Sequence, residues 1–157
     1  MPVFLLNGVI ETIKYIISGG RKSMQKANRH WMNDPNGFIY YKGKYHLFYQ
    51  CFPYEARWGR MHWAHVVSDD LVNWEYQGIA VFPSKTDDRD GCFSGSAVED
   101  EGKLYLYYTG VRYLVENPED INLFLDEQFV SAQMLITSED GYHFDNIKDK
   151  KTIIPVF

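Results

Sequence analysis

The heptapeptide Gly-Lys-Tyr-His-Leu-Phe-Tyr at residues 43–49 recurs as Gly-Lys-Leu-Tyr-Leu-Tyr-Tyr at residues 102–108. A second pair of matching segments follows at residues 67–74 and 137–144, where a polar turn that begins with Ser precedes Trp74 or Phe144. The chain therefore contains two copies of one unit. A unit that repeats along a chain at a spacing of this order is typical of propellers and other repeat folds.

Each copy reads as four short strands, because runs of aromatic and β-branched residues alternate with Gly and polar turns. We expect strands in the first copy at residues 37–41, 44–50, 61–68 and 77–82. In the second copy we expect them at residues 94–98, 103–109, 129–137 and 152–156. The first hairpin of each copy is predicted to turn at a Gly, Gly43 or Gly102, because Gly adopts positive φ without strain.

The second copy is longer than the first. The offset between the copies grows from 59 residues at the first match to 70 at the second, so the second copy carries 11 extra residues. They fall between Gly110 and Val130, where Asn, Pro and acidic residues predict a loop with a helical turn.

Two repeated four-stranded sheets predict an all-β fold, the first two blades of a β-propeller; a β-sandwich with chance internal similarity is the alternative. Two blades cannot close a ring, since propellers have about four to eight. We therefore expect the chain to be the N-terminal piece of a larger domain or to pair with another chain. An open second blade would expose an apolar face and an unpaired strand edge.

Composition narrows the classes of partner. The chain is 45% hydrophobic and 17% aromatic, which favours a folded β domain over disorder. A net charge of −5 gives no basic footprint, so we predict neither a nucleic-acid nor a membrane partner. Cys51 and Cys92 lack the spacing of a zinc or redox motif, and two free thiols in a reducing compartment are favoured over a disulfide.

Residues 1–28 are predicted to be an extension separate from the domain at residues 29–157. Apolar residues recur there at helical spacing up to Gly19-Gly20, which predicts a short amphipathic helix. Polar and charged residues interrupt the apolar run, so neither a secretory signal nor a membrane span is predicted, and we expect a cytoplasmic protein.

The strongest candidate for a functional motif is Trp-Met-Asn-Asp-Pro-Asn-Gly at residues 31–37. Taken alone it is a polar turn that Asp34 caps. However, it leads directly into the first strand of the repeat, and Trp31 and Met32 place apolar surface beside the carboxylate. Sugars bind to such mixtures, because aromatic faces cover the C–H surface of the ring while amides and carboxylates bind its hydroxyls.

An ordered set of motifs from about Trp31 to the end resembles glycoside hydrolase family 32, which includes invertases, sucrose-6-phosphate hydrolases and fructanases. The motifs are residues 31–37, residues 45–50, Trp58-Gly59, residues 63–65 with Ser68, Asp70, Leu71 and Trp74, and Cys-Phe-Ser-Gly-Ser-Ala at residues 92–97. The resemblance implies a five-bladed β-propeller followed by a β-sandwich, in agreement with the repeat. It also implies a β-fructofuranosidase that retains anomeric configuration and needs neither metal nor cofactor.

The resemblance further implies a role for particular residues. Asp34 would be the nucleophile that forms a covalent fructosyl intermediate on sucrose or sucrose 6-phosphate. The pocket for the terminal fructose would be lined by Asn33, Gln50 and Trp58, with Phe93 and Ser94 from the next blade. Because the first strands of all blades converge on a propeller axis, we expect Asp34 and Ser94 to meet there.

The second carboxyl group of such a site is missing from the sequence. A retaining glycosidase uses two carboxyl groups roughly 5 to 5.5 Å apart, one as nucleophile and one as proton donor. In the family, the donor lies in a Glu-Cys motif of a later blade, which residues 1–157 do not contain. We therefore predict that the isolated chain is inactive, with the rest of the enzyme as its possible partner. The alternative is a non-catalytic truncated or split-gene product that binds fructosides or a complementary chain.

Two other features are assigned to structure rather than to chemistry. The segment Asp-Asp-Arg-Asp-Gly at residues 87–91 hints at calcium, but Cys92 occupies a ligand position of an EF-hand loop, so we predict a solvated loop. The histidines lack metal-ligand spacing and are predicted to be ordinary packing or surface residues.

Overall fold

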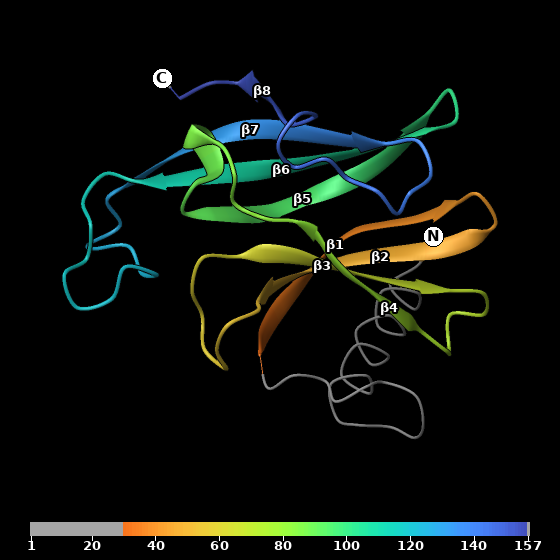
Figure 1. Ribbon diagram of the computed structural model, residues 1–157, viewed down its shortest axis with the longest axis horizontal. Helices are drawn as coiled ribbons and strands as arrows, with labels where there is room; N and C mark the ends of the chain where they lie inside the picture. The colour runs from red at the N-terminus through yellow and green to blue at the C-terminus, as the bar shows by residue number, and fades with distance from the viewer. Residues whose placement is uncertain (1–29, 157) are drawn as a thin grey trace, which may run out of the picture.

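The computed structural model describes residues 30–156, and the predicted N-terminal helix lies outside them. The described chain forms two four-stranded antiparallel sheets, each with its strands in sequence order, which confirms the predicted all-β fold (Figure 1). The first sheet contains β1 (Trp31–Tyr41), β2 (Lys44–Phe52), β3 (His62–Ser68) and β4 (Glu75–Val81). The second contains β5 (Gly91–Asp100), β6 (Lys103–Tyr113), β7 (Phe129–Ser138) and β8 (Lys151–Ile154). We refer to them as blade one and blade two.

Every predicted strand overlaps an observed one, but β1 is longer than expected. It includes the Asn-Asp-Pro-Asn-Gly segment, which the sequence suggests is a turn. The pairing of β1 with β2 shifts on both sides of Pro35, so the polar segment is accommodated as an irregular part of the strand. Proline is tolerated there because β1 is an edge strand, where a missing N–H need not break a ladder.

The two tight hairpins occur where they were predicted. Lys42 and Gly43 both have positive φ, as do Glu101 and Gly102. Two consecutive residues with positive φ form the turn whose twist matches that of the flanking strands. The same turn therefore fixes the register of the first strand pair in both blades.

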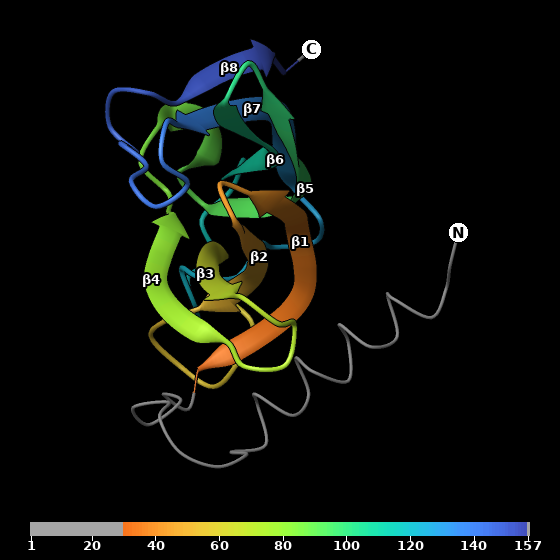
Figure 2. The ribbon, with the colours of Figure 1, turned by 90° about the vertical axis from the view of Figure 1, so that its right-hand side faces the viewer.

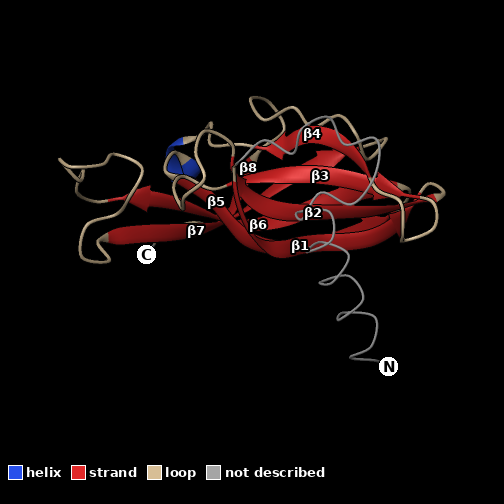
Figure 3. Cartoon of the chain, turned by 90° about the horizontal axis from the view of Figure 1, so that it is seen from below, coloured by secondary structure: helices blue, strands red, loops and turns tan. Residues whose placement is uncertain are grey.

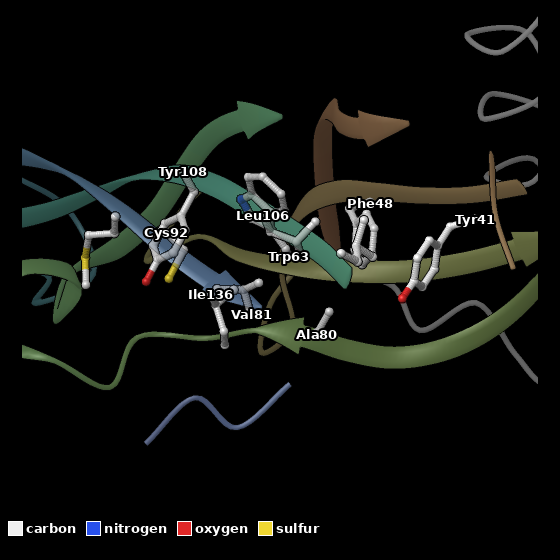
Figure 4. Close-up of a cluster of buried hydrophobic side chains, with 11 residues drawn as sticks. Tyr41, Phe48, Trp63, Ala80, Val81, Cys92, Leu106, Tyr108 and Ile136 are labelled. Atoms are coloured by element: carbon white, nitrogen blue, oxygen red, sulfur yellow. The ribbon is translucent and has the colours of Figure 1, made fainter. Parts of the chain in front are cut away.

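The blades pack face to face, and their innermost strands β1 and β5 lie side by side (Figure 2). A Cβ atom on Gly37 of β1 would lie only 2.6 Å from the Cβ of Ala97 on β5, so this crossing requires a glycine. Between the sheets lies the main hydrophobic core (Figure 4), built from Tyr41, Phe48, Trp63, Ala80 and Val81 of blade one and Cys92, Leu104, Leu106, Tyr108, Met134 and Ile136 of blade two. We call this interface the seam.

The connection between the blades differs from the prediction. It contains a short 3-10 helix, η1 (Thr86–Asp88), drawn in blue in Figure 3. The predicted solvated loop at residues 87–91 is wrong, because the side chains of Asp88 and Asp90 are buried. Lys150 pairs with the Asp88 carboxylate from far along the chain. The sequence of residues 87–91 gives no indication of this partner, which lies far along the chain.

The extra segment of the second copy, residues 114–128, is a loop of hydrogen-bonded turns with one isolated bridge between Glu116 and Phe124. It has no helix, so only the loop part of that prediction is correct. Cys51 and Cys92 are both buried free thiols. Within residues 30–156, no helix is both long enough and apolar enough to cross a membrane.

Candidate functional site

The six residues predicted to form the sugar site come from both blades. Asn33 and Asp34 lie on β1 and Gln50 on β2 of blade one. Phe93 and Ser94 lie at the start of β5 in blade two. Trp58 belongs to the loop of residues 53–61 between β2 and β3, which we call the Trp58 loop.

Asp34 and Ser94 meet across the seam. The Ser94 hydroxyl donates a hydrogen bond to Oδ2 of Asp34 at 3.3 Å, and both side chains are exposed. Two residues further along β1, the Asn36 side-chain oxygen accepts the Gly95 N–H at 3.4 Å. These contacts join the two innermost strands, as the repeat predicts. Within residues 30–156, Ser94 is the only hydrogen-bond partner of the Asp34 carboxylate, which is therefore open to an incoming molecule.

The amide side chains of the site are hydrogen-bonded to one another. Asn33 Nδ2 donates to Gln50 Oε1 at 2.6 Å, and Trp31 Nε1 donates to Asn33 Oδ1 at 3.0 Å. Gln50 is buried, whereas Asn33 is half-buried. The bonds to Trp31 and Gln50 identify which end of the Asn33 amide is oxygen and which is nitrogen, so its orientation is set by its neighbours.

Aromatic rings form one side of the site. Trp58 and Phe93 are half-buried and pack edge to face, with centroids 5.9 Å apart and planes 83° apart. The pair joins the Trp58 loop of blade one to the first strand of blade two. Trp63 Nε1 also donates to the Phe93 backbone carbonyl at 3.2 Å, which fixes the backbone beside Ser94.

The structure adds residues to the site that sequence reasoning missed. Asn36 lies inside the quoted motif, and its side chain links β1 to β5. Phe124 lies in the extra segment of the second copy and packs edge to face on Trp58 at 5.5 Å. The internal repeat gave no signal for Phe124, because the corresponding loop of the first copy, between β2 and β3, is shorter.

The arrangement places one open carboxylate beside paired amides and aromatic rings, a combination suited to a sugar. Among residues 30–156, none of the hydrogen bonds to the six predicted side chains comes from a second carboxyl group. In the same part of the chain, no three His, Cys, Asp or Glu side chains gather closely enough to hold a metal ion. The site therefore offers one open carboxylate with amide and aromatic groups beside it, without a second carboxyl group at hydrogen-bonding distance in residues 30–156.

Comparison with known proteins gives a consistent result. Residues 25–156 match the family model described as the glycosyl hydrolases family 32 N-terminal domain. The sucrose-6-phosphate hydrolase of Escherichia coli is 47% identical over 115 residues, which is 73% of this chain and 23% of that protein. The chain thus spans less than a quarter of the length of this relative.

Two solved structures have the same fold over most of the chain. A mutant of the Bombyx mori GH32 beta-fructofuranosidase in complex with sucrose matches with a TM-score of 0.62 and 36% identity, covering 90% of this chain and 30% of that one. The sucrose-6-phosphate hydrolase of Lactobacillus gasseri matches with a TM-score of 0.64 and 30% identity, covering 96% of this chain and 29% of that one.

Proposed function

Because this chain belongs to glycoside hydrolase family 32, we propose that it supplies the nucleophile and part of the sugar pocket for hydrolysis of terminal β-D-fructofuranosides with retained configuration. The observation that carries the proposal is the exposed Asp34 carboxylate at the junction of the two blades, held by Ser94. The amide pair of Asn33 and Gln50 and the ring pair of Trp58 and Phe93 support it.

The contacts of these residues support the chemistry that we assign to them. Ser94 binds Oδ2 of Asp34 and leaves Oδ1 to attack the anomeric carbon of the fructosyl group. The bond from that carbon to the leaving oxygen breaks, the oxygen takes a proton from an acid, and a fructosyl ester forms on Asp34. Water then attacks the same carbon and gives one proton back to that acid; the ester bond breaks, which releases fructose and the Asp34 carboxylate. Asn33 and Gln50 bind hydroxyls of the fructose, while Trp58 and Phe93 contact its apolar face.

The proton donor comes from outside residues 1–157 in this proposal, from further chain of the same enzyme. Blade two supports this arrangement because its outer face is uncovered. Val98 and Tyr107 are exposed there, while the alternating Ala97 and Leu106 pack into the seam. A sheet that continues the ring would cover this face and bring a second carboxyl group toward the axis.

The substrate we propose is sucrose or sucrose 6-phosphate. The solved Bombyx mori relative holds sucrose, and the relatives from Escherichia coli and Lactobacillus gasseri are named sucrose-6-phosphate hydrolases. We propose a cytoplasmic site of action on an imported disaccharide, because both cysteines are free thiols, as in a reducing compartment.

A chimaera tests the proposal. Residues 31–156 would replace the matching segment of the Escherichia coli sucrose-6-phosphate hydrolase, and fructose release from sucrose and sucrose 6-phosphate would be measured. We expect activity in the chimaera and none in purified residues 1–157. Asp34→Asn should reduce the chimaera's kcat by about a thousandfold or more, since it removes the attacking group.

The matched control is Asp100→Asn, which alters an exposed aspartate on β5 and should leave kcat unchanged. An active Asp34→Asn chimaera would show that Asp34 is not the nucleophile. An inactive but folded chimaera would favour the non-catalytic alternative, in which the chain at most binds fructosides.

A further inference from the structure

The extra segment of blade two reaches across to the sugar site. Residues 114–128, which we call the clamp loop, leave blade two between β6 and β7 and lie at the same end of the molecule as the Trp58 loop (Figure 1, cyan and yellow). The corresponding loop of blade one, between β2 and β3, is the Trp58 loop itself, which is shorter because the 11 extra residues occur only in the second copy. The two loops are joined by one aromatic contact and one ion pair.

The aromatic contact encloses Trp58 between two rings. Phe124 of the clamp loop packs against the indole with centroids 5.5 Å apart and planes 84° apart. Phe93 packs on it in the same edge-to-face manner at 5.9 Å. Two perpendicular ring neighbours restrict the rotation of the indole more than one does, since each ring edge favours one orientation of the indole face.

The ion pair lies one residue from Trp58. The Arg57 guanidinium donates to the Asp120 carboxylate of the clamp loop and also to Glu55 Oε2 at 2.6 Å. Asp120 is itself fixed, because its other oxygen accepts the Asn122 backbone N–H at 2.9 Å. The Arg57 side chain beside Asp120 lowers the pKa of that carboxyl group, so the pair is ionised at neutral pH.

The clamp loop has firm contacts at its base. Its ends are joined by a hydrogen bond from the Leu114 N–H to the Gln128 carbonyl at 2.9 Å. Phe124 packs on Tyr113 at the end of β6 and on Phe129 at the start of β7, at 6.0 and 5.2 Å. Phe124 is therefore anchored to blade two and can transmit the position of that blade to Trp58.

The Trp58 loop is also tied to the nucleophile strand. The Trp31 backbone N–H, at the start of β1, donates to the Glu55 carbonyl at 2.9 Å. Contacts thus run without a gap from blade two, through Phe124 and Asp120, to Trp58 and to the strand that carries Asp34.

We propose that Phe124 and Asp120 are positioning residues, which hold the Trp58 indole in the orientation that receives the sugar ring. The proposal rests on the proposed function for the identity of the ligand, but the positioning itself concerns only the protein. In these terms the 11 extra residues of the second copy serve to fix an aromatic ring of the neighbouring blade.

The first test reads Trp58 directly and needs no catalysis. The full chain would be labelled with 5-fluorotryptophan, and the fluorine resonance of Trp58 would be assigned as the signal that is lost in Trp58→Phe. Phe124→Ala should shift that resonance and move it toward the solvent-exposed position, while the Trp63 and Trp74 signals stay in place. Asp120→Asn should cause a smaller shift of the same signal.

Two variants separate positioning from damage to the fold. Ile121→Ala changes an exposed side chain of the same loop and should leave the Trp58 signal unmoved. Phe124→Tyr keeps the ring edge and should restore it. A Trp58 resonance that is identical in the parent protein and in Phe124→Ala would overturn the proposal.

The second test measures the consequence for the sugar. In the active chimaera, Phe124→Ala should raise KM for sucrose about threefold to tenfold with little change in kcat, because it disturbs a binding face and not the nucleophile. An unchanged KM would refute a role in the pocket. If Phe124→Ala shifts the Trp58 signal but the folded chimaera releases no fructose, the positioning is supported and the proposed hydrolysis is refuted. If the signal does not shift but the chimaera is active, the hydrolysis is supported and the positioning is refuted.

Discussion

Two aspartates at the junction of the blades have opposite environments. The Asp34 carboxylate is exposed, and within residues 30–156 one hydroxyl, at 3.3 Å, is its only hydrogen-bond partner. The Asp88 side chain is fully buried, and both of its oxygens are occupied. Its partners are the backbone N–H groups of Ser84 and Lys85, the Tyr108 hydroxyl at 2.8 Å, the Lys150 ammonium at 2.5 Å and the Cys92 thiol at 3.6 Å.

The difference separates a carboxylate that can react from one that maintains the fold. A carboxylate whose lone pairs are all occupied by protein donors has none left for a substrate, whereas Asp34 keeps at least one oxygen available. Burial raises the pKa of Asp88, but Lys150 and the two backbone N–H groups together lower it by more. The pKa of Asp88 therefore lies below its ordinary value. The Asp88 carboxylate therefore stays ionised, and its contact with Lys150 joins the connection between the blades to the segment before β8.

The largest expected effect concerns the buried Asp88. Lys150→Met leaves the Asp88 charge buried without a counter-ion and removes the ammonium bond to the Phe82 carbonyl at 2.5 Å. Breaking a buried ion pair on one side should lower the free energy of unfolding by about 3 to 5 kcal/mol. Urea unfolding followed by tryptophan fluorescence would measure it.

Lys148→Met is the matched control, since Lys148 is exposed and forms a surface pair with Asp145 at 3.8 Å. It should cost at most about 0.5 kcal/mol. A loss below about 1 kcal/mol in Lys150→Met would mean that the buried pair does not hold the blades together and that the contrast between the two aspartates is one of exposure alone.

A second expected effect comes from two histidines sealed in the seam. Tyr142 of blade two packs on His46 and His65 of blade one, and the two rings stack 5.1 Å apart, with their nitrogens 3.0 Å apart. Burial lowers the pKa of His65 to about 3, and it lowers that of His46 as well. The folded protein therefore takes up these protons less readily than the unfolded chain, whose histidines titrate near 6.5.

The sign of the pH dependence follows directly. The stability that depends on neutral histidines is fully present above about pH 6.5 and is lost as the pH falls toward 3, because the unfolded chain binds protons first. Between pH 7 and pH 5 the free energy of unfolding should fall by about 1 to 2 kcal/mol. His65→Gln should flatten this slope, because it removes one of the buried imidazoles whose pKa is lowered. A parent protein equally stable at both pH values would contradict this.

The sequence alone predicted the strands and the contact between Asp34 and Ser94. Hairpin turns and alternation are local signals, and the internal repeat places both residues at the start of an innermost strand. The sequence did not predict the burial of Asp88, because its partner Lys150 lies 62 residues away and the acidic segment itself is typical of a solvated loop. Phe124 was missed for a related reason, since its contact with Trp58 is made by a loop that is longer in the second copy than in the first.

The smallest expected effect concerns the stability of the open aspartate. Asp34→Asn keeps the shape of the side chain and an oxygen that can accept the Ser94 hydroxyl, and it acts where the side chain is already exposed. The free energy of unfolding should therefore change by no more than about 0.5 kcal/mol in either direction. Urea unfolding of Asp34→Asn, with Asp88→Asn measured beside it as the destabilised reference, would check this.

A loss of about 2 kcal/mol or more in Asp34→Asn would show that this carboxylate also maintains the seam, because only an interaction that the amide cannot replace has an effect of that size. Unchanged stability together with lost fructose release in the chimaera would assign the charge of Asp34 to chemistry alone.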